Sequence, residues 1–217
     1  MRVLKVLVGC ECSGEVREAF RALGHDAWSC DLQAADDNSE FHIQGDLFEA
    51  LKSQKWDLAI MHPPCTYISV SGMHRTTRGL RPRKLTDDAL DFVRDCMNAD
   101  VPYIAIENPI SVISTNIRKP DQIVQPYQFG DDASKSTCLW LKHLPKLPIA
   151  PDKRVPGRKV EYPVGSGKIK ERWANQTDSG QNRLGPSEDR AKNRSKTYPG
   201  IASAMADTWS KHILNNE

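Results

Sequence analysis

The sequence predicts an α/β fold with a mostly parallel central sheet, helices on both faces, and a small basic lobe rich in loops. Over residues 1–150, short apolar runs alternate with amphipathic helical stretches, which is the pattern of repeated βαβ units. Several runs stop abruptly at small, polar or ionisable residues, as strands do at the carboxyl edge of a parallel sheet. After Pro148 the sequence becomes rich in Gly, Pro, Asn, Ser and basic residues, which indicates the separate lobe.

The length and composition limit the classes of protein to which the chain can belong. The 217 residues can bury one substantial core, and no apolar run approaches the roughly 20 residues of a membrane helix. The amino terminus has no small-residue cleavage site, so we expect a cytoplasmic protein without a membrane partner. The six cysteines lack the regular framework of a secreted domain, and we expect mostly buried, reduced thiols. The cysteine and histidine spacings over residues 10–12 and 62–65 match no familiar zinc site, and we expect no metal.

The first unit has the layout of a βαβ segment that holds a nucleoside-bearing cofactor. We predict a strand over Val3–Val8, a turn of small residues over Gly9–Gly14, and an amphipathic helix over Glu15–Leu23. A second strand, Ala27–Cys30, is closed by Asp31. In such a unit the small-residue turn lets the backbone approach the ligand, and the acid accepts hydrogen bonds from ribose hydroxyls.

A third short strand is predicted over Phe41–Ile43 and is closed by Gly45 and Asp46. Asp46 is well placed as the N-cap of a helix over Leu47–Lys52. A contact with the adenine edge of a cofactor is compatible with that capping role.

One stretch, WDLAIMHPPCTYIS, indicates the centre of the chemistry. Its apolar residues, Leu58–Met61, predict a buried parallel strand that stops at Pro63 and Pro64. Cys65 follows directly, which places a thiol in the crevice where open α/β sheets bind their ligands.

A carboxylate follows another buried strand, Val101–Ile106, which ends in Glu107, Asn108 and Pro109. Such a carboxylate is rarely placed for packing, because burying its charge without a partner is costly. If this strand neighbours the one before Cys65, the two side chains share one crevice. A thiol nucleophile and an acid form the pair needed to add to a heteroaromatic ring and protonate it.

Two basic segments favour a polyanionic partner. Val70–Leu85 is predicted as a long loop with several basic residues and no acid, although a merely solvated loop is the alternative reading. Residues 151–196 contain twelve Lys or Arg against six Asp or Glu, a local net charge of +6 in a chain whose total is +2. Our candidates for contact with nucleic acid are Ser69, Arg75, Arg78, Arg81, Lys135, Arg154, Arg158 and Lys159.

The remaining predicted elements complete the sheet and its cover. A helix capped by residues 86–88 runs to about Asn98, with Leu90, Val93 and Met97 on one face. A strand is predicted over Thr137–Leu141. A closing helix, 199–214, turns Ile201, Met205, Thr208 and Trp209 inward.

In the order of these motifs the chain resembles the cytosine C5 DNA methyltransferases, within the Rossmann-like class I S-adenosylmethionine-dependent methyltransferases. Residues 63–69 resemble the two prolines and cysteine that end the catalytic strand of that family. Glu107-Asn108 resembles its second hallmark, a glutamate-asparagine pair after a buried strand. Ser13-Gly14, Asp31 and Gly45-Asp46 resemble its cofactor motifs. The likeness is closer to short methyltransferase-like proteins of bacteriophages, which implies DNA as the partner and, for a phage-encoded protein, the host-cell cytoplasm.

The resemblance also implies residue roles. Cys65 would attack C6 of cytosine as a thiolate, Glu107 would hydrogen-bond N3 and the exocyclic amine, and Asn108 would help to hold the loop around Cys65. C5 would then take the methyl group from S-adenosylmethionine. Because a duplex hides C5 and C6, the enzyme would flip the base or use single strands. The implied cofactor-binding residues are Gly9, Glu11, Ser13, Gly14, Asp31, Asp46 and Pro63.

The chain departs from the family pattern at three points. Glu11 and His62 stand where glycines are usual, and Lys135-Ser136-Thr137 is a weak form of the arginine motif. The chain is also short, so we divide it into a catalytic domain over 1–150, a basic lobe over 151–196 in place of a full target-recognition domain, and a closing helix over 197–217. We expect a monomer or weak dimer.

Three other functions fit parts of the sequence. In an amino-group methyltransferase, HPPC would be a variant of the aspartate-proline-proline-tyrosine motif. That motif supplies an acceptor for the exocyclic amine and an aromatic ring that stacks on the base, and His62 and Cys65 supply neither. A C5 enzyme acting on free pyrimidine nucleotides or RNA is a second alternative. A non-catalytic DNA-binding protein, which would not need Cys65, is the third.

Overall fold

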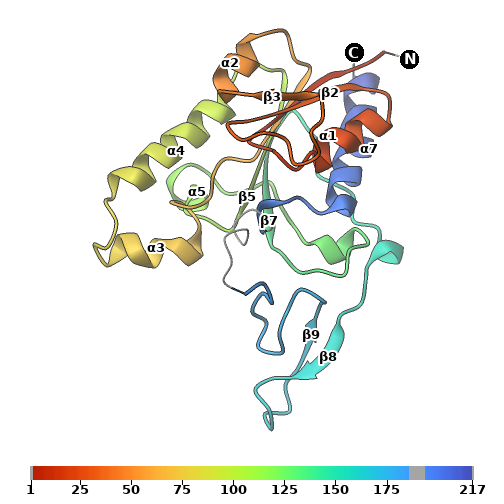
Figure 1. Ribbon diagram of the computed structural model, residues 1–217. Helices are drawn as coiled ribbons and strands as arrows, with labels where there is room; N and C mark the ends of the chain where they lie inside the picture. The colour runs from red at the N-terminus through yellow and green to blue at the C-terminus, as the bar shows by residue number, and fades with distance from the viewer. Residues whose placement is uncertain (1, 186–193, 217) are drawn as a thin grey trace.

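A computed structural model describes residues 2–185 and 194–216. Its centre is a seven-stranded sheet in the order β3-β2-β1-β4-β5-β7-β6 (Figure 1). The strands are β1 (Lys5–Gly9), β2 (Asp26–Asp31), β3 (His42–Gln44), β4 (Leu58–Met61), β5 (Tyr103–Pro109), β6 (Gln122–Val124) and β7 (Thr137–Lys142). β7 runs antiparallel to β5 and β6, and the other pairings are parallel. The expected α/β class with a mostly parallel sheet is confirmed.

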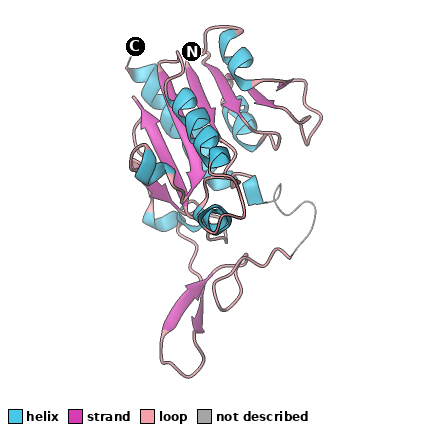
Figure 2. Cartoon of the chain, turned by 90° about the vertical axis from the view of Figure 1, so that its left-hand side faces the viewer, coloured by secondary structure: helices cyan, strands magenta, loops and turns pink. Residues whose placement is uncertain are grey.

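Helices cover both faces of the sheet (Figure 2). They are α1 (Glu15–Ala22), α2 (Leu47–Lys52), α3 (Val70–Thr77), α4 (Lys84–Met97), α5 (Ile113–Asn116) and α7 (Pro199–Asn215), with the 3-10 turns η1 (Pro126–Gln128) and η2 (Pro151–Lys153). Side chains alternate along the strands, so Val6 and Val8 join the core under α1 and α7 while Leu7 joins the core under α2, α4 and α5. Among the described residues, no helix is both long and apolar enough to cross a membrane.

The closing helix α7 packs against α1 on one face of the sheet. Met205 and Trp209 are fully buried there, and the Trp209 indole donates to the carbonyl oxygen of Pro145 at 3.0 Å. Gly200, in the first turn of α7, donates its backbone N–H to Asp131 Oδ2 at 3.0 Å. A Cβ atom on Gly200 would lie only 2.2 Å from the carbonyl oxygen of Phe129, so this contact needs a glycine.

The basic segment forms an antiparallel hairpin, β8 (Arg158–Glu161) and β9 (Ile169–Arg172), that projects away from the sheet (Figure 1). Trp173 attaches it to the sheet domain by stacking on Tyr127, with ring centroids 3.9 Å apart and planes 7° from parallel. The guanidinium of Arg154 lies over both rings. Residues 186–193 of the predicted lobe lie outside the described residues.

The prediction of a loop over Val70–Leu85 is wrong. Residues 70–77 form α3, and α4 already begins at Lys84. No residue of α3 is buried, so the segment has no apolar stripe by which a helix could be recognised. The predicted cap at residues 86–88 is also wrong, because Thr86 lies inside α4 and its hydroxyl donates to the carbonyl oxygen of Tyr67 at 3.0 Å.

The predicted end of the fifth strand at Ile106 is too early. β5 continues to Pro109 because β7 pairs with it there, placing Glu107 opposite Leu139 and Asn108 opposite Cys138. This extra pairing fixes the backbone that carries both candidate catalytic residues.

Candidate active site

The candidate site lies at the carboxyl edge of the sheet, where β4 ends beside β5. The parallel register places Met61 beside Ile106, so the next residues, His62 and Glu107, are neighbours as well. His62 Nδ1 and Glu107 Oε2 are 2.8 Å apart, and both side chains are largely buried. The strand that carries Glu107 therefore does neighbour the strand before Cys65, which is the condition for the two side chains to share one crevice.

Cys65 sits on a loop that is fixed from several directions. The backbone N–H of Ser69 donates to the carbonyl oxygen of Cys65 at 2.8 Å, which makes a turn after the two prolines. Asn108 is buried and its amide donates to the carbonyl oxygen of Pro63 at 2.7 Å, which is the contact expected of it. Arg81 donates to the carbonyl oxygen of Thr66 at 2.9 Å. The half-buried thiol is therefore held on a rigid loop.

The two candidate catalytic groups have opposite pKa shifts. Burial raises the pKa of the Cys65 thiol and the nearby charge of Glu107 raises it further, whereas Lys135 and Arg194 lower it less strongly. Burial would also raise the pKa of Glu107, but the hydrogen bond from His62 and the charge of Lys135 outweigh it and leave that pKa below its usual value. The free protein therefore holds an ionised carboxylate beside a protonated thiol.

The charge of Glu107 should control how fast Cys65 reacts. We expect Glu107→Gln to lower the Cys65 pKa and so to speed alkylation by iodoacetamide at pH 7.5, by about tenfold for each pKa unit. Lys135→Met should slow it, because it removes a positive charge that favours the thiolate. Peptide mass analysis measures labelling at Cys65 alone, and Cys65→Ser gives the background. Equal rates in all three folded proteins would contradict the electrostatic coupling.

Four of the predicted cofactor residues lie at the end of β1 or in the turn that follows it. Gly9 ends β1, and Gly14 takes the left-handed conformation, with φ of 75°, just before α1. A Cβ atom on Gly14 would also lie 2.3 Å from Arg17 Nη2. Glu11 is buried and its carboxylate accepts the backbone N–H groups of Val16 at 2.8 Å and Arg17 at 3.3 Å. Ser13 lies beside it, with its hydroxyl 3.3 Å from Glu11 Oε1.

Glu11 therefore supplies the negative charge at the amino end of α1, a place where a ligand anion would otherwise bind. Burial raises the pKa of Glu11, and His62 and the two backbone N–H groups oppose that shift. The sequence analysis gave Glu11 both as an implied cofactor residue and as a departure from a glycine pattern, and this capping contact explains why a carboxylate stands there.

The other predicted cofactor residues lie along the same edge. Asp31 ends β2 and accepts the backbone N–H of Gln33 through Oδ1 at 2.9 Å. Asp46 caps α2, accepting from Phe48 and Glu49, as predicted. Pro63 is buried beneath the Cys65 loop.

The sequence did not single out Arg17. Its side chain is fully buried, donates to Ser29 Oγ at 2.8 Å and forms an ion pair with Asp37. The only signal for Arg17 in the sequence was that a charged residue falls on the apolar, inward face of a predicted amphipathic helix.

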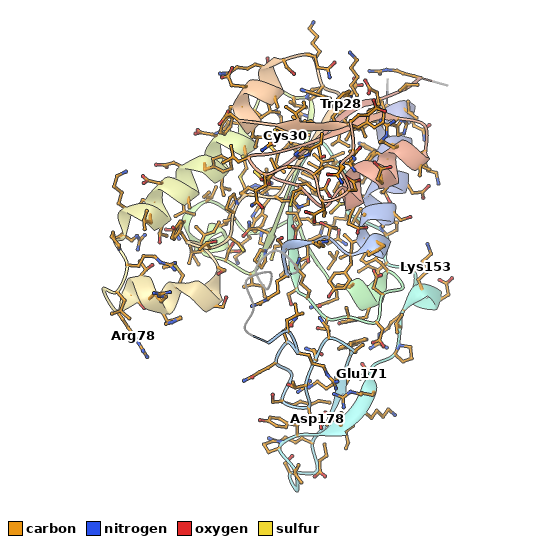
Figure 3. The ribbon with its side chains drawn as sticks, in the orientation of Figure 1. Trp28, Cys30, Arg78, Lys153, Glu171 and Asp178 are labelled. Atoms are coloured by element: carbon orange, nitrogen blue, oxygen red, sulfur yellow. The ribbon has the colours of Figure 1, made fainter. Side chains whose placement is uncertain are left out.

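Four of the predicted nucleic-acid residues lie in α3 or close to its ends. Arg75 and Arg78 are exposed and form no ion pair within the described part of the chain, and Arg78 points outward at the far end of the helix (Figure 3). Arg81 instead supports the Cys65 loop, with its guanidinium 4.8 Å from the centre of the Tyr67 ring. Ser69 lies at the amino end of α3.

The remaining predicted contacts are mostly engaged within the protein. Lys135 donates to the carbonyl oxygens of Ser195 at 3.4 Å and Lys196 at 3.1 Å, next to the candidate site. In the lobe, Arg154 pairs with Glu171, and Arg158 pairs with Asp178 at 2.6 Å. Lys159 is exposed on β8.

No protein-family model matches the sequence, and a search of curated proteins finds no match. Solved structures with a similar chain path include a methyltransferase of Entamoeba histolytica, at 16% identity and a TM-score of 0.49, covering 72% of this chain and 59% of that one. A protein described as a DNA modification methyltransferase encoded within an Escherichia coli prophage has 15% identity and a TM-score of 0.43, covering 64% and 46%. An rRNA methylase from Escherichia coli has 13% identity and a TM-score of 0.37, covering 65% and 57%. The matched region spans about half the length of these proteins.

Proposed function

We propose that the protein is a DNA (cytosine-5)-methyltransferase that transfers a methyl group from S-adenosylmethionine to C5 of cytosine through a covalent Cys65 adduct. One observation carries the proposal: a thiol on a fixed loop and a buried, ionised carboxylate lie at the ends of adjacent parallel strands. Addition to a pyrimidine needs a nucleophile for C6 and a group that stabilises the changed charge on the ring, and these two residues supply both.

In the proposed reaction the Cys65 thiol passes its proton to the Glu107 carboxylate as the base binds, and the thiolate attacks C6. The C5–C6 π electrons form a C4–C5 double bond, and the C4–N3 π electrons bind the proton that Glu107 donates to N3. Glu107 also accepts a hydrogen bond from the exocyclic amine, which favours this adduct. Asn108 keeps the loop in place during attack through its bond to Pro63. After C5 has gained the methyl group, its proton passes to water, the C5–C6 double bond re-forms and the C6–S bond breaks. The proton on N3 then returns through Glu107 to the released thiolate.

The residues present fit the proposed cofactor, which supplies an electrophilic methyl group when bound. Asp31 and Asp46 each use Oδ1 within the protein, and in the described part of the chain their Oδ2 atoms make no hydrogen bond. These oxygens suit the ribose hydroxyls and the adenine amine. Glu11 already neutralises the amino end of α1, so the acidic part of the ligand would have to be held elsewhere.

The amino-group alternative is less well supported. That chemistry needs an aromatic ring to stack on the base at the position of Cys65, and a thiol supplies none. Nucleoside mass analysis separates the candidates after purified protein is incubated with S-adenosylmethionine and DNA, RNA or free cytidine nucleotides. The proposal expects 5-methylcytosine in DNA. N4-methylcytosine or N6-methyladenine would support the amino-group reading, and no methylated base in any arm would support a binding role.

DNA binding should depend on the free arginines of α3. Replacing both Arg75 and Arg78 with glutamine is expected to reduce the slope of log affinity against log salt concentration by up to about 1.8. Each lost phosphate contact contributes about 0.9 to that slope. The matched control is Arg83→Gln with Lys84→Gln, which removes the same charge from residues already paired with Asp87 and Asp88. An unchanged slope in the α3 variant would show that this helix does not contact phosphate.

A further inference from the structure

His62 occupies the junction between the two halves of the sheet. The strand order turns back between β1 and β4, and the carboxyl ends of the strands at such a point form the ligand crevice of open α/β sheets. The backbone N–H of His62 donates to the carbonyl oxygen of Gly9 on β1 at 2.9 Å. Its ring contacts Glu107 on β5. One residue thus connects the cofactor turn with the candidate catalytic carboxylate.

The contact with His62 fixes one oxygen of Glu107 and leaves the other available. Oε2 is 2.8 Å from His62 Nδ1, whereas Oε1 makes no hydrogen bond with any residue that the structure describes. A side chain of Glu has three rotatable bonds, so a carboxylate without such a contact would sample several orientations. The charged and titratable groups facing this carboxylate are His62, Lys135, Cys65 and Cys138.

Packing alone does not explain a histidine at this position. Its second nitrogen, Nε2, is buried and has no partner within residues 2–185 and 194–216. Leaving a buried polar atom without a hydrogen bond costs about 1–3 kcal/mol, and native proteins rarely keep such a group without a use. A smaller or apolar residue would fill the space without that penalty, so the contact with Glu107 is the reason for the imidazole.

We propose that His62 is a positioning residue of the methyltransferase, one that holds Glu107 through Oε2 so that Oε1 stays fixed to accept the exocyclic amine of cytosine. This inference rests on the proposed function. In this role His62 does not touch the reacting atoms. It acts on the reaction through the orientation of Glu107.

Two variants of His62 test this role. His62→Leu removes the donor, and we expect kcat for cytosine methylation to fall about 100-fold, the size of loss that misplacing a catalytic group produces. His62→Asn keeps an amide N–H close to the position of Nδ1, and it should recover kcat to within about tenfold of wild type. The KM for S-adenosylmethionine should stay within about twofold in both variants.

A double-mutant cycle supplies the control. With Glu107→Gln already present, His62→Leu should reduce kcat by less than about threefold, because the group that it positions is gone. If His62 were purely structural, the loss in kcat would instead follow the loss in melting temperature, and His62→Asn would not recover it. The loss would also be equally large in the Glu107→Gln background.

The possible failures are distinct. Wild-type protein that makes no 5-methylcytosine refutes the proposed function, and the positioning role falls with it. Wild-type protein that makes 5-methylcytosine while His62→Leu keeps its kcat refutes the positioning role alone.

Discussion

Replacing Cys65 with serine is expected to abolish cytosine methylation, with a loss in kcat of at least about 10⁴-fold. Serine keeps the size of the side chain, and the half-buried loop should keep its bonds to Asn108 and Arg81. The hydroxyl is a far weaker nucleophile than a thiolate, and removal of an attacking group commonly costs this much or more. Production of 5-methylcytosine measured by nucleoside mass analysis reports the loss directly.

The same variant should still bind S-adenosylmethionine with an affinity within about threefold of wild type, since all the predicted cofactor residues except Pro63 lie outside the Cys65 loop. Cys96→Ala, which removes a buried thiol from α4, is the matched control and should retain turnover. Methylation by Cys65→Ser at a rate near that of wild type would contradict the covalent mechanism. Loss of cofactor binding together with activity would show that the substitution disturbed the fold.

Gly200→Ala is expected to have the largest effect on stability, about 3 kcal/mol lost from the free energy of unfolding. The new Cβ would overlap the carbonyl oxygen of Phe129, which is backbone and cannot rotate away. Relieving that overlap would also disturb the bond between the Gly200 N–H and Asp131 at the start of α7. For a protein of this size such a loss lowers the melting temperature by roughly 6–12 °C.

Ser203→Ala is the control for this measurement because Ser203 is exposed on the same helix. It should leave the melting temperature almost unchanged, since alanine is a good helix former at an exposed position. A Gly200→Ala protein as stable as this control would mean that α7 can move away from residue 129 without loss of packing.

The parts of the fold with strong local signals could be predicted from the sequence. The buried strands β1 and β4 are continuous apolar runs, and each ends at a residue type that breaks a strand. Asp46 caps α2 through its own side chain, so its role depends only on neighbours in the sequence. The candidate catalytic residues were predictable for a related reason, because Cys65 follows the two prolines that end the β4 run and Glu107 comes directly after the apolar residues of β5.

What the sequence could not give depends on contacts between distant segments. The pairing of His62 with Glu107 follows from the register between β4 and β5, and the burial of Arg17 depends on Ser29 and Asp37. Helix α3 has no buried face to reveal it. The positive charge of the lobe suggested that its basic side chains are available to contact phosphate. Arg154 instead pairs with Glu171, an acid that the hairpin brings close to it.

The packing of α7 against α1 has a consequence for synthesis of the chain. Phe20 of α1 emerges from the ribosome early, but Met205 and Trp209, which cover the same core, emerge about 180 residues later. Until α7 has been made, the nascent chain exposes the apolar sheet face that this helix covers. Such long sequence separation slows folding and leaves the face open to aggregation, so a truncation before residue 199 should bind chaperones in the cell rather than accumulate as folded protein.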